Sequence, residues 1–348
     1  MSLAALLGSD LPLIQAPMAG SQGSALAIAV CAAGGLGSLP CAMLSAEAVR
    51  NEVAAIRAAT VQPFNLNFFC HSLPAPDAAR DAAWRAQLAP YYAEFGIDPA
   101  SIAAGPGRSP FTAESAELVE ALRPAVVSFH FGLPAQELLA RVQATGAKLL
   151  ASATTVAEAL WLQERGVDAV IAQGLEAGGH RGHFLSDDLS EQLGLFALVP
   201  QLVRALRLPV IAAGGIADAQ GVKAAMVLGA AGVQVGSAYL LCPESSTSAV
   251  HRAALQFADA GHTALTNLFT GRPARGIVNR FMREQGPLNA AVPEFPLATG
   301  AVAPLRALAE SRGNGDFSPL WAGQNAHGGR PMRAGELTRQ LAVGFSGI

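Results

Sequence analysis

The residues best suited to carry out chemistry lie in the segment Gln173-Gly-Leu-Glu-Ala-Gly-Gly-His180. It directly follows the apolar run Ala169–Ala172, which is typical of a buried strand. Gly178 and Gly179 allow the backbone to approach a flat or phosphorylated ligand, because they carry no side chain. The imidazole of His180 titrates near neutral pH and can move a proton. The segment therefore predicts a ligand-binding loop with a proton-transfer group at the end of a parallel strand.

Two further glycine-rich turns follow later apolar runs. Gly214 and Gly215 come after Pro209–Ala213, and Gly236 follows Gly232–Val235. Backbone N–H groups at such turns, beside the start of a helix, favour an anion, and the equivalent loops of (β/α)8 barrels form the usual phosphate site. Asp218 is expected to cap the next helix, which is a structural role.

Other candidate ligand-binding residues lie in or directly after earlier apolar runs of the sequence. Met18, between Pro17 and Gly20, suits a backbone that passes over a flat ring, although a lone methionine can also fill a core. Asn65 and Asn67 face the same side of one strand, so both amides must find partners inside the fold. His130 ends another predicted strand, so we expect it near the mouth of the ligand site. There it would either contact the ligand or have a structural role. A phosphate site, an apolar first loop and these amides together describe a site for FMN.

These residues need a scaffold that brings strand ends together. Eight short apolar or β-branched runs are each followed by a turn and then, for most, by an amphipathic stretch; they are Leu13–Ala16, Gly35–Leu39, Phe64–Phe69, Val126–His130, Lys148–Ser152, Ala169–Ala172, Pro209–Ala213 and Gly232–Gly236. The expected helices include Ser45–Ala58, Ala135–Thr145, Thr155–Arg165 and Asp218–Leu228. Alternation of this kind predicts parallel βαβ units, and eight of them predict a (β/α)8 TIM barrel. An open doubly wound sheet is the competing fold, but no GxGxxG opens the first helix.

Two stretches exceed minimal barrel units. We expect residues 1–242 to form the FMN-binding barrel core with a long loop insertion at 71–115. Residues 243–348 are expected to form an extension or lid that contributes to the substrate pocket and to barrel closure. An added helical layer or a dimer surface is the alternative for these stretches.

Composition excludes several classes of protein. The chain is 51% hydrophobic and 14% charged with a net charge of −3, which favours a large buried core and gives no reason to expect nucleic acid. No signal peptide and no membrane span are expected. Four scattered cysteines without a CxxC pair predict neither a disulfide framework nor a metal site, so a reduced cytoplasmic protein is expected.

Four motifs also occur in order on the expected strand ends. They are Pro12-Leu-Ile-Gln-Ala-Pro-Met18, Phe64-Asn-Leu-Asn-Phe-Phe-Cys-His71, Ser128-Phe-His-Phe-Gly132 and Gln173-Gly-Leu-Glu-Ala-Gly-Gly-His-Arg-Gly182. With the two glycine turns they cover residues 12–237 and resemble the nitronate monooxygenase family, formerly called 2-nitropropane dioxygenases, in particular its class I enzymes. One departure is Ser21, where more glycine is expected.

The resemblance implies an FMN-dependent flavoenzyme that oxidises alkyl nitronates, such as propionate 3-nitronate, with O2. The products would be carbonyl compounds and nitrite or nitrate, which detoxifies nitro compounds. It implies no metal and no reduced nicotinamide, and we expect a monomer or homodimer. His180 would be the catalytic base. The implied FMN contacts are Met18, Asn67, Gln173, Gly178, Gly179, Gly214, Gly215, Gln234, Val235, Gly236 and Ser237.

Elementary chemistry agrees with these roles. A nitronate is an electron-rich anion that a flavin can oxidise, whereas a neutral nitroalkane must first lose a proton from carbon to a general base. His180 suits the role of general base because of its position after the glycine turn. His130 and His183 are the alternatives for the base, and both are also expected to contact the substrate. His183 is expected on the rim of the site. Arg181, Arg272 and Arg275 would attract an anion or be solvated surface charges.

Two other functions remain open. An NAD(P)H:quinone reductase or an FMN-dependent enoyl reductase would share the Glu-Ala-Gly-Gly-His loop, while the histidine-containing motifs at 64–71 and 128–132 favour the monooxygenase. A barrel that binds a phosphorylated ligand without flavin is the second alternative.

Overall fold

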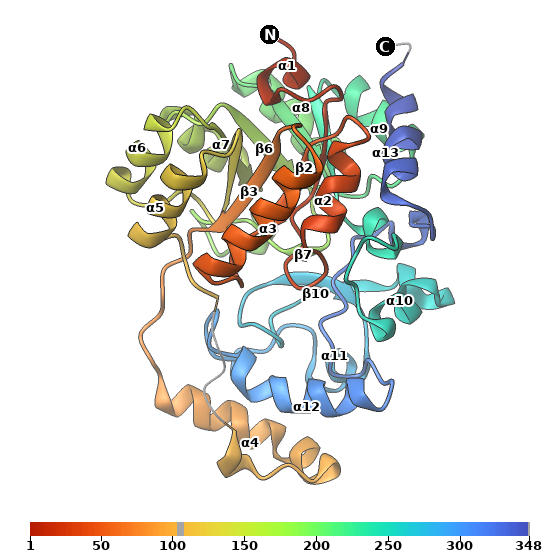
Figure 1. The fold of residues 1–348 in the computed structure, drawn as a ribbon. Coiled ribbons are helices and arrows are strands. Elements are labelled where there is room, and N and C mark those ends of the chain that lie inside the picture. Colours follow the sequence, from red (N-terminus) through yellow and green to blue (C-terminus); the bar gives the residue numbers. More distant parts are fainter. Residues whose placement is uncertain (103–107, 347–348) are drawn as a thin grey trace.

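The computed structural model describes residues 1–102 and 108–346. Eight parallel strands form its main sheet: β1 (Leu13–Gln15), β2 (Gly37–Pro40), β3 (Phe64–Phe69), β4 (Val126–His130), β5 (Lys148–Ala153), β6 (Ala169–Gln173), β8 (Val210–Ala213) and β9 (Gly232–Val235). Their order is β1-β9-β8-β6-β5-β4-β3-β2. A parallel bridge between Ile14 and Leu36 joins the two ends of this order. The predicted (β/α)8 barrel is therefore confirmed (Figure 1).

Helices cover the outside of the barrel. They are α2 (Ser24–Cys31), α3 (Ala46–Ala59), α5 (Ala113–Leu122), α6 (Gln136–Ala144), α7 (Val156–Glu164), α8 (Leu195–Ala205), α9 (Ala219–Val227) and α13 (Ala334–Ala342). Local sequence explains them, as α3 illustrates. The Ser45 hydroxyl accepts a hydrogen bond from the Ala48 N–H (3.2 Å) at its start, and Val49, Val53 and Ile56 bury one face. The four helices expected from sequence are all present, and Asp218 caps α9 as expected.

The barrel interior is apolar at one end and polar at the other. Helix α1 (Leu3–Leu7) closes the amino-terminal end, where its leucines pack with Ile14, Ile171 and Ile211. Nearer the carboxyl ends of the strands, Asn65 and Asn67 point inward, and both donate to the Ser128 hydroxyl at 2.9 Å. The open, polar end is thus the one on which a ligand site is expected.

The two long stretches pack together below the strand ends in Figure 1. Helix α4 (Ala78–Phe95) contributes Trp84 and Tyr92 to a second core, which α11 (Arg280–Gln285) and α12 (Thr299–Ser311) complete. Helix α10 (Ala249–Gln256) lies beside them. Residues 103–107 of the predicted insertion and 347–348 of the predicted extension lie outside the described residues.

The C-terminal extension also returns to the barrel. Ala334, Leu337 and Leu341 of α13 are buried in the main core, and Tyr239 donates or accepts a hydrogen bond with Thr338 at 2.8 Å. Helix α13 thereby takes the place of the helix that would follow β9. The boundary at residue 242 remains a prediction, but the barrel core includes residues beyond it.

The segment that carries His180 forms a short strand where we expected only a turn. Strand β7 (Gly179–His180) pairs antiparallel with β11 (Ala274–Ile277), which pairs with β10 (Thr263–Thr266). The C-terminal extension therefore holds this segment by main-chain hydrogen bonds. Sequence periodicity over two residues carries no strand signal.

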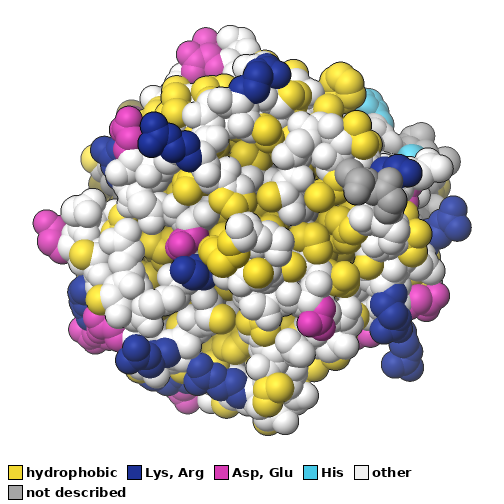
Figure 2. Space-filling model, turned by 90° about the horizontal axis from the view of Figure 1, so that it is seen from above, with side chains coloured by type: hydrophobic (Ala, Val, Ile, Leu, Met, Phe, Trp, Pro, Cys, Tyr) yellow, Lys and Arg dark blue, Asp and Glu magenta, His cyan; other side chains and the backbone are white. Residues whose placement is uncertain are grey.

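The surface is mixed in charge. Figure 2 views the end that carries the termini, where basic and acidic side chains are interspersed. Across residues 1–102 and 108–346, every helix is too short or too polar to cross a bilayer.

A substitution at Gly37 tests how closely helix α2 packs on the barrel wall. A Cβ on Gly37 of β2 would lie 2.3 Å from the Ala27 carbonyl oxygen of α2. We expect Gly37→Ala to destabilise the protein by about 3 kcal/mol, because the helix must move away from the strand. Its thermal midpoint should fall by roughly 5 °C or more. Gly335→Ala in α13 is the matched control, since its Cβ would meet nothing closer than 3.4 Å. Equal midpoints for the two variants would refute this packing argument.

Candidate active site

A cavity of about 1280 Å³, open to solvent on one side, lies at the carboxyl ends of the strands. Most of the residues predicted from sequence line it: Met18, Asn67, His130, Gln173, Gly178, Gly179, His180, Gly214, Gly215, Gln234, Gly236 and Ser237. They come from loops far apart in the sequence, so the barrel brings them together.

Two predicted residues do not line the cavity. Val235 is 1% exposed and packs in the outer core, because alternation along β9 turns it away from Gln234. His183, expected on the rim, is 2% exposed. Its Nε2 lies 3.6 Å from an Asp187 oxygen, and burial, followed by the charge of Arg272, lowers its pKa to about 3. The chain turns inward after His180, because Gly182 packs directly against the His130 ring.

His180 is half-buried in the cavity wall. Its ring packs 5.3 Å from Phe295 and 5.6 Å from Trp321, measured between centroids. Desolvation is the main reason that the pKa of His180 lies well below its usual value, and the positive charges of Arg108 and Arg272 add to it. The imidazole is therefore neutral at neutral pH.

The hydrogen bonds of His180 indicate its tautomer. Nε2 lies 2.9 Å from the Thr270 hydroxyl, and that hydroxyl donates to the Arg272 carbonyl oxygen (3.4 Å). When the Thr270 hydroxyl donates to that carbonyl, it accepts from Nε2–H, and this tautomer of His180 leaves the lone pair on Nδ1. Nδ1 makes no hydrogen bond within residues 1–102 and 108–346. A neutral ring with a free lone pair can accept a proton.

His130 also lines the cavity, but both of its nitrogens have protein partners. Nε2 donates to the His180 carbonyl oxygen (3.2 Å), and Nδ1 therefore accepts from the Ser152 hydroxyl (3.0 Å). Burial lowers its pKa to about 3. His130 thus supports the backbone of His180.

Gln173 holds the same backbone. Its Nε2 donates to the His180 carbonyl oxygen (2.9 Å), and its Oε1 accepts from the Gly182 N–H (2.7 Å). Both ends of the amide are occupied by the loop that Gln173 precedes. A direct contact with a cofactor remains a prediction for this side chain.

The arginines singled out from sequence have structural roles. Arg181 is fully buried and donates to the carbonyl oxygens of Gly174 (2.7 Å) and Gln173 (2.9 Å). Arg275 is 7% exposed and donates to the Leu175 carbonyl oxygen (2.8 Å). Arg272 donates to the His183 carbonyl oxygen and lies over the Phe131 ring at 4.3 Å. None of the three is a solvated surface charge, because loop carbonyls require buried donors.

The glycine loops that line the cavity fit an anion, and Gln234 fits a polar ring. The backbone N–H groups of Gly215 and Gly236 have no acceptor in the described part of the chain. Gly215 has φ +68° and Gly179 has φ +72°, and a Cβ on Gly179 would enter open space. The buried Oε1 of Gln234 has no hydrogen-bond partner among the described residues. Unpartnered groups of this kind indicate a ligand that supplies the missing bonds.

Sequence reasoning missed several residues at the site. Arg108, Thr270, Phe295, Trp321 and Asn325 all come from the insertion or the extension, where no strand period indicates which side chain faces the barrel. Phe295 lies in a Pro-rich stretch at 287–304 and Trp321 in Pro319–Gln324, but the composition of these segments does not indicate which side chains face the barrel. Asn325 donates to the Gly215 carbonyl oxygen (2.9 Å) and so braces the predicted anion loop.

Comparisons with known proteins agree with this geometry. Residues 2–344 match the family described as Nitronate monooxygenase. A protein of Pseudomonas aeruginosa named "Nitronate monooxygenase" is 44% identical, with 98% of each chain covered. A protein of the same name from Paraburkholderia phytofirmans is 43% identical, covering 98% of this chain and 93% of the relative.

Solved structures give the same result. A nitroalkane oxidase from Streptomyces ansochromogenes superposes with a TM-score of 0.90 at 37% identity, covering 99% of this chain and 98% of the other. FabK from Thermotoga maritima reaches a TM-score of 0.75 at 25% identity, with coverages of 99% and 96%. With the strand-end motifs, the cavity and the matched profile all in agreement, the chain belongs to the nitronate monooxygenase family of oxidoreductases.

Proposed function

We propose that the protein uses FMN to oxidise alkyl nitronates, propionate 3-nitronate among them, with O2 to carbonyl compounds and nitrite or nitrate. The observation that carries the proposal is that one cavity combines a neutral imidazole with a free lone pair and glycine N–H groups that have no acceptor in the described part of the chain. Such a cavity accommodates a cofactor with an anionic tail and a substrate with an acidic C–H bond.

The residues that would hold FMN fall into two groups. Gly215, Gly236 and Ser237 would bind the phosphate through main-chain N–H groups. Met18 and Gln234 would contact the ring, since Gln234 offers an unused acceptor. When bound, FMN supplies the electron acceptor for the nitronate and the group that reacts with O2.

His180 would take the proton from carbon when the substrate arrives as a neutral nitroalkane. The Thr270 hydroxyl and the Gln173 amide orient the ring and its backbone. Nδ1 is the nitrogen that receives the proton, and the resulting imidazolium would stand beside the nitronate anion. A substrate that is already a nitronate does not need this step.

An aromatic wall would keep water away from the reacting carbon. Phe69, Phe131, Phe295 and Trp321 surround His180 with ring centroids 5.3–6.2 Å from it. Phe131 has φ +69°, which is rare for an aromatic residue and turns its ring toward the histidine.

A reductase on the same scaffold is the second candidate, and the similarity to FabK favours keeping it. The two functions differ in the reductant: anaerobic NADH would bleach the flavin of a reductase rapidly and leave that of a nitronate monooxygenase oxidised. A protein that stays colourless and binds no added FMN would instead support a non-flavin barrel.

Replacing His180, the proposed base, should affect neutral nitroalkanes and preformed nitronates differently. We expect His180→Asn to lower kcat/KM for a neutral nitroalkane by about 10²- to 10⁴-fold. Oxidation of the preformed nitronate should lose much less, because no carbon proton is removed. The measurement is O2 consumption with both forms, and His262→Asn at an exposed site is the control. Equal losses on both forms would mean that His180 binds the anion instead.

The pH dependence follows from the lowered pKa of His180. Only the neutral ring is a base, and burial shifts its protonation to more acidic pH. We therefore expect kcat/KM for a neutral nitroalkane to stay constant as the pH falls from 8 to about 6.5 and to decline only at lower pH. A midpoint at or above 6.5 would show that His180 titrates as an ordinary histidine.

The anion loop can be tested by cofactor binding alone. We expect Gly215→Val to weaken FMN binding on the order of tenfold or more, because the side chain keeps the phosphate from the N–H group. The control is Gly313→Val, which has the same backbone strain (φ +72° against +68°) at a site remote from the cavity. The dissociation constant is measured by flavin fluorescence, and unchanged FMN affinity for Gly215→Val would contradict the placement of the phosphate.

A further inference from the structure

Residues 320–325 of the C-terminal extension form a segment that runs along one wall of the active-site cavity. Three of its residues line the cavity: Trp321, Gly323 and Asn325. One side of the segment follows β11, where the Ile277 N–H donates to the Leu320 carbonyl oxygen (2.8 Å). Strand β11 also pairs with β7, which carries His180, and the Trp321 ring lies 5.6 Å from the His180 ring. The segment is therefore attached to the same strand as the proposed base.

The other side of the segment packs against the glycine turn that follows β6. The Gln324 N–H donates to the Glu176 carbonyl oxygen at 2.9 Å. A Cβ on Gly178 would lie 2.5 Å from the Ala322 carbonyl carbon. A Cβ on Gly323 would lie 2.7 Å from the Glu176 carbonyl oxygen. Both contacts join backbone to backbone, so neither position accepts a side chain unless the segment moves.

The same segment donates two hydrogen bonds to the loops that are predicted to bind phosphate. The Gly323 N–H donates to Ser237 Oγ (2.8 Å). The hydroxyl proton of Ser237 remains available, since it has no acceptor within residues 1–102 and 108–346. The side-chain amide of Asn325 donates to the Gly215 carbonyl oxygen (2.9 Å). Because a peptide unit is planar, this bond also fixes the direction of the Ile216 N–H, which has no acceptor among the described residues.

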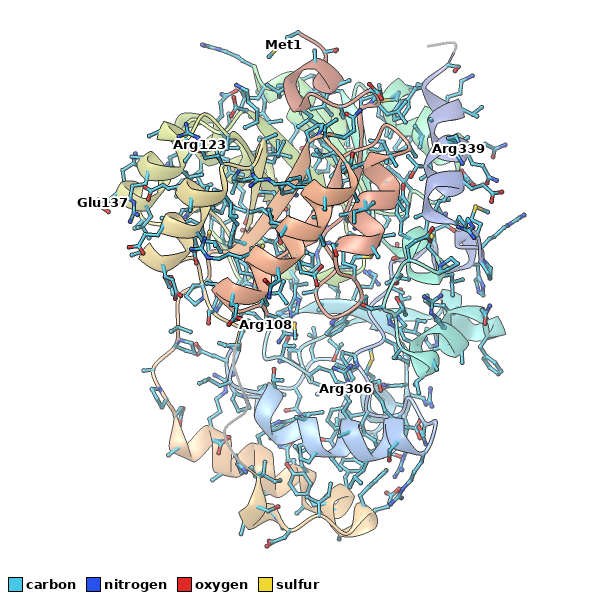
Figure 3. All side chains as sticks on the ribbon, viewed as in Figure 1. Met1, Arg108, Arg123, Glu137, Arg306 and Arg339 are labelled. Atoms are coloured by element: carbon cyan, nitrogen blue, oxygen red, sulfur yellow. The ribbon has the colours of Figure 1, made fainter. Side chains whose placement is uncertain are left out.

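The loops predicted to bind phosphate offer neutral donors only. Residues 214–217 (Gly-Gly-Ile-Ala) and 236–239 (Gly-Ser-Ala-Tyr) include no lysine or arginine. Among the described residues that line the cavity, Arg108 is the only lysine or arginine, and Figure 3 shows it between the barrel and α12. A hydrogen bond weakens steeply when its donor points away from the acceptor. The affinity of these loops for an anion therefore depends on the direction of each N–H and O–H group.

We propose that residues 320–325 position the donors that bind the FMN phosphate. Gly323 directs the Ser237 hydroxyl, and Asn325 directs the peptide unit between Gly215 and Ile216. The phosphate site is then built jointly by the barrel, which supplies the donors, and by the extension, which orients them. The inference rests on the proposed function, because FMN is the ligand that this function requires.

The test compares FMN with riboflavin, which has the same ring system and ribityl chain but lacks the phosphate. Protein freed of flavin is titrated with each compound, and binding is followed by flavin fluorescence. We expect Asn325→Ala to weaken FMN binding by about three- to tenfold, because the donors of the Gly215 loop lose their orientation. Riboflavin binding should change by less than about twofold. Asn325→Asp should weaken FMN binding further, since it places a negative charge beside the phosphate site.

Asn314→Ala is the matched control. Asn314 is also an exposed asparagine of the extension, but its side chain bonds only to Asp316 in the described part of the chain (2.6 and 3.0 Å). It does not line the cavity. This variant should bind both flavins like the wild type. Retained riboflavin affinity in Asn325→Ala shows that the variant is folded and that its ring site is intact.

The outcomes separate this inference from the proposed function. If the wild type oxidises nitronates and Asn325→Ala loses neither flavin or both equally, the role of the segment is overturned and the function stands. An Asn325-dependent preference for FMN over riboflavin, in a protein that consumes no O2 with nitronates, would support the role of the segment and overturn the proposed function. Wild-type protein that binds neither flavin would overturn both.

Discussion

The active site depends on one buried hydrogen-bond network that holds the backbone from Gln173 to Gly182. Gln173 binds the His180 carbonyl oxygen and the Gly182 N–H, His130 donates to the same carbonyl, and Arg181 satisfies the carbonyls before the turn. Strand pairing with β11 completes the set. These hydrogen bonds are buried or partly buried, and together they fix the position of the His180 backbone.

The same cations act on both partners of the proposed reaction. Burial and then the charges of Arg108 and Arg272 lower the pKa of His180, which keeps the ring unprotonated, and Arg108 also adds positive charge to the cavity that it lines. A lower pKa also makes the ring a weaker base. Under the proposed function, these charges would favour binding of an ionised substrate over deprotonation of a neutral one.

Sequence periodicity and strand-end motifs predicted the barrel and the part of the site that the barrel itself supplies. All eight strands and the four named helices were found, because apolar runs and capping residues act locally. Val235 could have been excluded by alternation along its strand, whereas the burial of His183 depends on Gly182 packing against His130. Arg181 illustrates the limit most clearly: its guanidinium is buried because carbonyls of its own loop face it, and no pattern of residue types encodes that. Thr270, Trp321 and Arg108 were missed because they come from irregular segments whose orientation is set by long-range packing.

The position of helix α13 in the sequence has a consequence for how the protein folds during its synthesis. This helix is the last α-helix among the described residues, and it closes the wall between α9 and α2. During synthesis the strands leave the ribosome before this helix does, so the nascent barrel exposes an apolar seam until α13 has been synthesised. The helices that cover the strand ends are encoded within the sequence of the barrel, because α4 lies between β3 and β4 and the other helices lie between β9 and α13. We therefore expect the barrel to be completed only after the extension that precedes α13 has been made.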